Sequence, residues 1–106
     1  MPADAIIDPS KVSAYLLRWR AEDDKSAFLG RAGYSLDNPG RLLKDIREQV
    51  LLADAEFIEG TEYGPKFRIR GRLSGPNGRT LHVVTIWMRE TATNQTKFVT
   101  LFPDEV

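Results

Sequence analysis

The chain has 106 residues, the size of one ordinary domain, since single domains cluster near ~100–150 residues. Its 42% hydrophobic and 28% charged residues are close to globular averages, which excludes a disordered tail and a bundle of membrane helices. Fifteen basic and fifteen acidic side chains give a formal net charge of zero, so binding partners must be inferred from the local arrangement of charge. The lack of cysteine excludes a disulfide framework and a cysteine nucleophile, and the single histidine, His82, excludes multi-histidine metal sites.

The amino-terminal residues do not resemble a secretory signal. Residues 1–8 contain no basic region and no long apolar run, and no window approaches the ~20 apolar residues of a membrane helix. We therefore expect a cytoplasmic domain with no membrane contact, no metal and no cofactor. A toxin module cut from a larger secreted chain would also lack a signal. The chain has no repeats or linkers, so residues 1–106 are interpreted as a single domain with a helical half over about 8–53 and a strand meander over about 55–103.

Helical periodicity marks the first half of the chain. Asp8-Pro9-Ser10 is typical of a helix start, and the next apolar residues form one stripe: Val12, Tyr15, Leu16 and Trp19. Asp23 and Asp24 are candidate caps for a short second helix that contains Ala27, Phe28 and Leu29 and stops at Gly33. Asp37-Asn38-Pro39 opens a third helix. Its predicted buried face is Leu42, Leu43, Ile46, Val50 and Leu51, with Asp45 on the solvated side.

From residue 55 onward the apolar period changes to two. The pattern predicts strands over 56–61, 66–73, 80–90 and 96–102, separated by turns rich in glycine, proline and asparagine. Short connections favour antiparallel neighbours. The predicted fold is therefore α+β, with the amino-terminal helices packed on one face of a four-stranded antiparallel meander.

One set of registers keeps the faces of this sheet consistent. It places Ser74 opposite Arg79, Glu90 opposite Lys97 and Thr61 opposite Lys66. The face expected beneath the helices then carries Phe67, Ile69, Val84, Ile86, Met88, Val99 and Leu101.

The opposite face of the predicted sheet combines cations with apolar groups. One strand supplies Lys66, Arg68, Arg70 and Arg72, the next supplies Leu81, Val83, Thr85 and Trp87, and the last supplies Phe98, Thr100 and Phe102. Cations attract phosphates and aromatic rings stack on unpaired bases, so this face is a candidate RNA-binding surface. Two alternatives remain open: the acidic first strand neutralises the cations as ordinary cross-strand pairs, or a partner protein or second copy covers the face.

Several residues have an ordinary structural interpretation from the pattern alone. In the register above, His82 falls on the core side opposite Gly71, which favours a structural role over proton transfer. Lys25 has the position of a solvated helix charge, and Thr85 and Thr100 are unremarkable strand residues. No P-loop, G-x-S-x-G, H-E-x-x-H or EF-hand pattern occurs, so nucleotide hydrolysis, serine hydrolysis and metalloprotease chemistry are unsupported.

The second half nevertheless resembles a family of small bacterial domains of unknown function. The resemblance rests on the following segments: Gly64-Pro65-Lys66-Phe67, Gly71-Arg72-Leu73, Pro76-Asn77-Gly78-Arg79, Thr85-Ile86-Trp87 and Phe98-Val99-Thr100-Leu101-Phe102-Pro103. In the helical half, Lys25-Ser26-Ala27-Phe28 and Gly33-Tyr34 are similar to the same family. Its members are small stand-alone proteins or toxin-like modules.

The order of helices followed by a meander is in turn similar to the barnase, EndoU, colicin and RelE-like fold of metal-independent ribonucleases and toxins. This resemblance implies that Lys25, Lys66 and Thr100 are the positions to test first, with Arg79, Thr85 and Trp87 near them. The chain lacks a well-placed histidine pair, which argues against a histidine-based acid–base mechanism.

The resulting hypothesis is a metal-independent ribonuclease-type toxin of a toxin–antitoxin or related conflict system. Lys66 with Arg68 or Arg70 would stabilise the phosphorane charge, Thr100 would hold the phosphate, Lys25 or His82 would move the proton, and Trp87 would stack a base. Lys66→Ala is expected to abolish cleavage and leave the fold intact. The alternative is a non-catalytic binding module covered by a cognate antitoxin, another small partner protein or a second copy.

Overall fold

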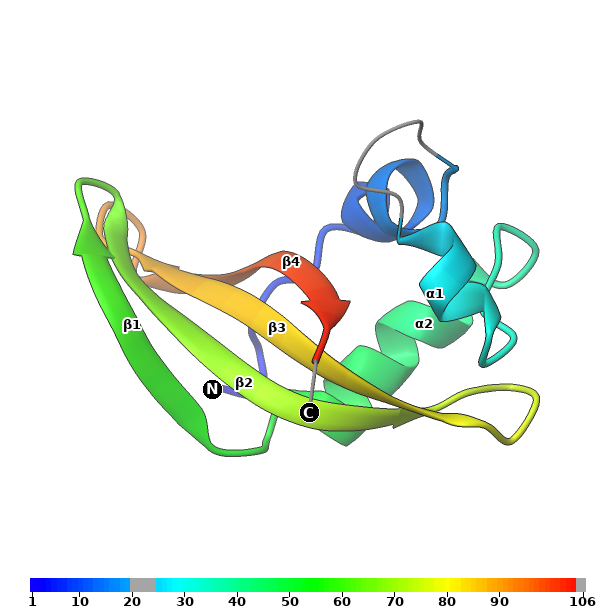
Figure 1. The fold of residues 1–106 in the computed structure, drawn as a ribbon. Coiled ribbons are helices and arrows are strands. Elements are labelled where there is room, and N and C mark those ends of the chain that lie inside the picture. Colours follow the sequence, from blue (N-terminus) through cyan, green and yellow to red (C-terminus); the bar gives the residue numbers. More distant parts are fainter. Residues whose placement is uncertain (20–24, 105–106) are drawn as a thin grey trace.

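A computed structural model describes residues 1–19 and 25–104, which form an α+β fold (Figure 1). The helical half contains η1 (Lys11–Leu16), α1 (Ser26–Gly30), α2 (Pro39–Asp45) and η2 (Ile46–Val50). The strands are β1 (Ala55–Thr61), β2 (Gly64–Ser74), β3 (Thr80–Glu90) and β4 (Gln95–Pro103), in the antiparallel order β1-β2-β3-β4. The predicted fold class is therefore confirmed. None of the described helices is long and apolar enough to cross a membrane.

The first helix begins where the sequence predicts. A carboxylate oxygen of Asp8 accepts hydrogen bonds from the backbone N–H and the hydroxyl of Ser10, both at 2.9 Å. The helix then takes π geometry, which occurs mostly as short insertions and often at functional sites. Val12 and Leu16 are buried, but Trp19 is 73% exposed, so its assignment to the apolar stripe is wrong. Asp23 and Asp24, the predicted caps of the second helix, lie outside the described residues.

The third predicted helix corresponds to α2 and η2, which follow one another without a break. Pro39 occupies the first turn, and Ile46 and Val50 are buried against the sheet. The prediction that Asp45 is solvated is wrong, because this residue is only 3% exposed. Its carboxylate accepts hydrogen bonds from the Tyr34 hydroxyl at 2.7 Å and from Arg41 Nε at 2.8 Å. A buried carboxylate with these two donors connects α2 to the loop after α1.

The observed register of β2 and β3 differs by one residue from the predicted register. Ser74 pairs with Thr80 rather than Arg79, because Arg79 belongs to the turn. Within that turn the Gly75 N–H donates to the Arg79 carbonyl at 2.9 Å, and Gly78 adopts a φ of 86°. This one-residue difference in register places the β3 side chains on the opposite face of the sheet from the one predicted.

The other two registers also differ from those predicted. Glu90 pairs with Gln95 rather than Lys97, and a shift between Ile86 and Trp87 brings Ile86 opposite Thr100. In the first hairpin Thr61 pairs with Gly64. This tighter turn requires a glycine, because Gly64 has a φ of 144° and a side chain there would overlap the Arg89 carbonyl oxygen of β3.

The core therefore differs from the predicted one on β3. The sheet residues in the hydrophobic core are Ile69, Leu73, Leu81, Val83, Trp87, Phe98 and Leu101. Ile69 and Leu101 were predicted there, whereas Leu81, Val83, Trp87 and Phe98 were expected on the open face. Trp87 is fully buried and its ring meets that of Phe98 edge to face, with centroids 5.3 Å apart.

Two contacts fix parts of the chain that have no regular structure. The turn between β2 and β3 docks on the end of α1, where the Asn77 N–H donates to the Ala32 carbonyl at 3.2 Å. A side chain at Gly75 would overlap the same carbonyl oxygen. At the other side of the sheet, Ile6 pairs with β4, since its N–H donates to the Thr96 carbonyl at 2.7 Å and its carbonyl accepts from the Phe98 N–H at 2.8 Å. The amino-terminal segment thus covers part of the β4 edge.

Candidate functional site

Lys25, Tyr15 and Thr100 form a polar cluster from three separate parts of the chain. Lys25 Nζ donates to Tyr15 Oη at 2.7 Å and to Thr100 Oγ1 at 2.9 Å. The two hydroxyl oxygens are 3.2 Å apart, within hydrogen-bond distance. The ammonium also lies 4.8 Å from the centroid of the Tyr15 ring, a favourable cation–π distance.

Each element presents its side chain for a local reason. Tyr15 is on η1, one residue before Leu16, whose burial anchors the helix beside β4. Lys25 is the residue that precedes α1, and the burial of Leu29 in the next turn draws the start of this helix toward the core. Thr100 lies on β4 beyond the register shift. The cluster consequently joins the helical half to the last strand.

The structure changes the interpretation of Lys25. The pattern predicts a solvated helix charge, but the residue is buried, at 7% exposure. Taking an ammonium group out of water costs several kcal/mol unless hydrogen bonds satisfy it. Hydroxyl groups held around a buried cation can also turn their hydrogens toward an anion, so this arrangement suits the binding of a phosphate or carboxylate.

Tyr15 was missed as a functional residue from the sequence. Its spacing with Val12 and Leu16 assigned it to the apolar stripe, and the half-buried ring agrees with that assignment. Membership of the apolar stripe accounts for the ring of Tyr15 but not for its hydroxyl group. A tyrosine on an apolar helix face places a polar group at the rim of the core, where a partner is usually found.

Two of the predicted substrate-binding residues are buried in the core. The Trp87 indole N–H donates to Thr85 Oγ1 at 2.8 Å, and the Thr85 hydroxyl donates to the Ile69 carbonyl at 3.2 Å. Neither residue is exposed beside the arginines of β2. The prediction that Trp87 stacks a base is therefore wrong, because the one-residue slip turns this side chain beneath the helical layer.

Acidic partners surround the arginines of the open face. Arg68 donates to Glu56 at 2.9 Å and Arg70 donates to Asp104 at 2.7 Å. The hydrogen bond and charge of Arg68 hold the pKa of Glu56 below its ordinary value. Neutralisation of this row by the first strand was one of the alternatives left open by the sequence, with Glu59 opposite Arg68, and in the structure Glu56 has that position. Arg68 and Arg70 thus carry their own counter-charges.

The remaining predicted site residues are not beside the Lys25 cluster. Lys66 pairs with Met88, so its backbone lies roughly 12 Å from that of Thr100, at ~4.8 Å per strand and ~3.3 Å per residue. His82 is exposed opposite Arg72, so its predicted place on the core side opposite Gly71 is wrong. It lies roughly 13 Å along β3 from Ile86, the partner of Thr100. Arg79 is exposed in the β2–β3 turn.

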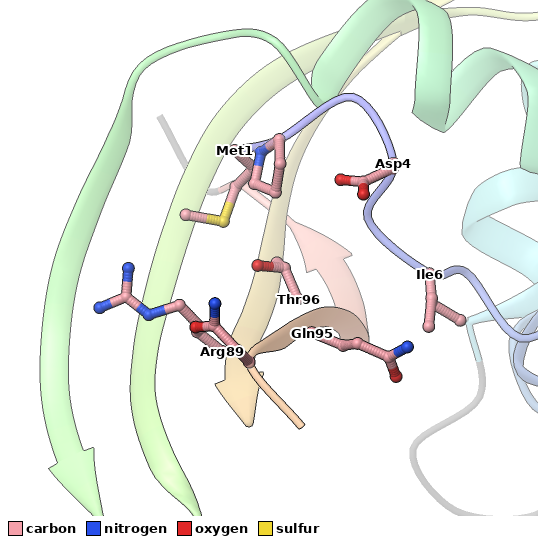
Figure 2. A pocket seen from close by; sticks show the side chains of 8 residues that line it. Met1, Asp4, Ile6, Arg89, Gln95 and Thr96 are labelled. Atoms are coloured by element: carbon pink, nitrogen blue, oxygen red, sulfur yellow. The ribbon is translucent and has the colours of Figure 1, made fainter. Parts of the chain in front are cut away.

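A separate hollow of about 510 Å³ lies between the amino-terminal segment and the β3–β4 hairpin (Figure 2). Its lining includes Asp4, Arg89 and Thr96, and none of the predicted site residues. In Figure 2 the Arg89 guanidinium extends away from Asp4, and it lies 5.6 Å from the centroid of the Phe67 ring on β2. The groups of this hollow do not converge on one point, so we do not assign a site there.

The fold and the cluster define a small α+β domain with a buried lysine at the junction of its two halves. Residues 3–105 match the family described as a domain of unknown function, DUF6883, and the chain belongs to this family. The fold is also similar to that of a chain in the contact-dependent growth inhibition toxin–immunity protein complex from Klebsiella pneumoniae 342. That likeness has a TM-score of 0.65 at 13% identity, and covers 98% of this chain and 97% of the other. No curated protein matches the sequence.

Proposed function

We propose that this domain is a ribonuclease-type toxin of a bacterial conflict system and that it cleaves RNA at the Lys25 cluster without a metal ion. The observation that carries the proposal is the buried Lys25 ammonium within 2.9 Å of the hydroxyls of Tyr15 and Thr100. The similarity of fold to a chain of a toxin–immunity protein complex supports the toxin class. Lys25 and Thr100 are also two of the three positions that the resemblance to ribonuclease toxins implies, and Lys66 is the third.

The proposed reaction is transfer of the phosphoryl group within the RNA strand. The ribose 2′-oxygen bonds to the adjacent phosphorus while the bond from phosphorus to the 5′-oxygen of the next nucleotide breaks. The products are a 2′,3′-cyclic phosphate and a 5′-hydroxyl. One proton leaves the 2′-oxygen to water and one joins the 5′-oxygen, so the reaction needs no oxidant, reductant or net water.

Each residue of the cluster has a distinct role in this reaction. The Lys25 ammonium stabilises the negative charge that develops on the phosphate oxygens, as preorganised cations do in phosphoryl transfer. The Thr100 hydroxyl donates to one of these oxygens. The Tyr15 hydroxyl, which accepts a hydrogen bond from Lys25, passes a proton to the leaving 5′-oxygen and regains one from the ammonium. Lys25 then takes up from water the proton that the 2′-oxygen released, which restores the ammonium.

The basic residues outside the cluster would hold the rest of the strand. Lys66, with its backbone roughly 12 Å from that of Thr100, would contact a neighbouring phosphate, and Arg79, roughly 23 Å along β3 from Ile86, would contact a more distant part of the strand. Arg68 and Arg70 would contribute less, because Glu56 and Asp104 already pair with them. Lys66 is thus proposed as a binding residue whose loss weakens cleavage without abolishing it.

Cleavage of bulk RNA by the purified chain in EDTA tests the proposal. Wild-type protein should produce fragments that end in 2′,3′-cyclic phosphate, and Lys25→Met should lose this activity. Lys44→Met is the matched control, because it makes the same change at an exposed lysine of α2. Intact RNA with the wild-type chain, or equal cleavage by Lys25→Met, would refute the assignment.

Expression in a bacterial host separates this proposal from the alternative of a non-catalytic binding module. Wild-type protein should arrest growth, a neighbouring open reading frame should relieve the arrest, and Lys25→Met should be harmless. A wild-type chain that is harmless, copurifies with a small partner and leaves RNA intact would instead favour the binding module.

A further inference from the structure

The segment 51–65, which contains β1, is unlike the rest of the surface in two respects. It carries Asp54, Glu56, Glu59 and Glu62 and no lysine or arginine. It also exposes large apolar side chains: Leu52 is 69% exposed, Phe57 63% and Tyr63 66%, and Ile58 is exposed beside them. Large exposed apolar groups gathered on one element mark an interaction surface.

β1 is also an open edge of the sheet. In the described part of the chain, β2 is the strand that pairs with β1, and no second strand lies on its outer side. Figure 1 shows β1 at the end of the sheet away from α1 and α2. The opposite edge differs, because the pairing of Ile6 with Thr96 and Phe98 covers part of β4. The backbone N–H and C=O groups on the outer side of β1 can therefore accept another strand.

The charge of this edge restricts its occupant. A second copy of the chain would bring Glu59 and Glu62 close to the same acidic residues, and like charges on adjacent strands are unfavourable. The register shift between Phe57 and Glu59 interrupts the ladder and disfavours such self-pairing further. A nucleic acid would meet the same repulsion. A protein strand with basic side chains complements both the acidic residues and the exposed apolar groups.

We propose that β1 is a docking edge for a lysine- or arginine-bearing β-strand of a partner protein, which extends the sheet by one strand. Phe57 and Ile58 would contact the apolar side chains of that strand, and Glu59 and Glu62 would pair with its cations. The inference does not depend on ribonuclease activity, since the Lys25 cluster is on η1, α1 and β4.

A defined peptide tests this surface on the full chain. The probe is a nine-residue peptide in which valine and threonine alternate between lysines at its ends and centre. Two controls replace its lysines with glutamate or methylate two successive central backbone nitrogens, which blocks strand pairing on both edges. Backbone amide shifts in NMR titrations should move in residues 55–61 with the basic peptide and not with either control.

Variants of the chain complete the test. Glu59→Lys with Glu62→Lys should weaken binding of the basic peptide at least about fivefold, since two attractive cross-strand pairs become repulsive. Asp37→Lys with Glu48→Lys, an equal charge change at two exposed residues outside β1, should leave binding within about twofold. Shifts outside β1, equal binding of the glutamate or methylated peptide, or self-association through β1 in analytical ultracentrifugation would each overturn the proposal.

Discussion

Two tyrosine clusters join the helices to the sheet, and they differ in the charged group that the tyrosine contacts, a carboxylate in one and an ammonium in the other. In one, the Tyr34 hydroxyl and Arg41 donate to the buried Asp45 carboxylate, so a cation lies 2.8 Å from the anion. In the other, the buried Lys25 ammonium donates to the hydroxyls of Tyr15 and Thr100. The first arrangement directs two donors to a carboxylate. The second places two hydroxyl groups beside an ammonium, and these hydroxyls can turn their hydrogens toward an anion.

Under the proposed function, the Tyr34 cluster is structural and the Lys25 cluster is reactive, although both contain a tyrosine and a buried charge. The surroundings of Tyr34 are those of a structural residue. Burial, and then the hydrogen bond to Asp45, raise the pKa of the Tyr34 hydroxyl well above its ordinary value. Changes in the Tyr34 cluster should therefore alter stability, and changes in the Lys25 cluster should alter activity.

The largest effect is expected from Lys25→Met. RNA cleavage should fall at least about 100-fold, because loss of one preorganised donor to a developing charge costs 10²–10³ in rate. The chain should stay folded because methionine fills a similar volume, although loss of the hydrogen bonds from Lys25 should lower the free energy of unfolding by roughly 1–3 kcal/mol. Cleavage rates and urea unfolding of the same preparation measure both. A strongly destabilised Lys25→Met protein would erase the distinction between the two clusters.

Tyr34→Phe should have the converse effect. Loss of the hydrogen bond to a buried carboxylate should reduce the free energy of unfolding by about 2 kcal/mol and leave cleavage unchanged. Tyr63→Phe, at an exposed tyrosine, serves as the control. Urea unfolding of the three proteins at pH 7 gives the comparison, and an unchanged midpoint in Tyr34→Phe would show that this cluster adds little.

The pH dependence of stability gives a second test of the structural role of Tyr34. The unfolded chain releases the Tyr34 proton near pH 10, whereas the folded chain retains it, so the unfolded state binds fewer protons above that pH. Stability from this group is thus fully present below pH 10 and is lost as the pH rises toward the folded pKa. Urea unfolding between pH 8 and pH 11 should show a decline in the wild type that is smaller in Tyr34→Phe. Identical declines would assign the effect to the other tyrosines.

Thr100→Val should lower cleavage roughly tenfold, the value of one hydrogen bond to a charged group, about 1.5 kcal/mol. Valine retains the shape of threonine on β4, so the unfolding midpoint should stay close to that of the wild type. Single-turnover cleavage assays measure the rate. A loss as large as that of Lys25→Met would give Thr100 a more central role than the proposed reaction does.

The smallest effect is expected from Lys66→Ala, about two- to threefold. If Lys66 contacts a single-stranded phosphate, the slope of log affinity against log salt should become shallower by about 0.7. Filter binding to RNA at several salt concentrations, in the inactive Lys25→Met background, measures this slope. Abolished cleavage in Lys66→Ala would instead favour the earlier expectation that this lysine stabilises the phosphorane.

The sequence predicts the order of the helices and strands, but the predicted buried face of β3 is wrong for a physical reason. β2 alternates cations with apolar groups, which identifies its buried face. β3 is apolar on both sides, with Val84, Ile86 and Met88 on one and Leu81, Val83 and Trp87 on the other. Either face can enter the core, so the choice depends on whether Arg79 belongs to the turn, and hydrophobic pattern alone does not report that.

Only part of the candidate site could be predicted from the sequence, because its residues come from distant parts of the chain. Lys25 and Thr100 are 75 positions apart, and spacing alone gives no indication that they meet. The family resemblance selected both residues, and the structure adds Tyr15. The apolar ring of Tyr15 accounts for its position in the helical stripe, so the sequence offers no reason to assign a role to its hydroxyl. Asp45 was misjudged similarly, since an aspartate on a helix is ordinarily solvated and its buried partner, Tyr34, comes from another segment.

The docking of the β2–β3 turn on the end of α1 has a consequence for how the domain can diversify. Asn77 and Gly75 meet the Ala32 carbonyl, and α1 starts at the residue after Lys25. A side chain at Gly75 would have to displace the Ala32 carbonyl, and with it the short helix that begins next to Lys25. Under the proposed function, substitutions in this turn would change the cleavage rate while Lys25, Tyr15 and Thr100 stay the same.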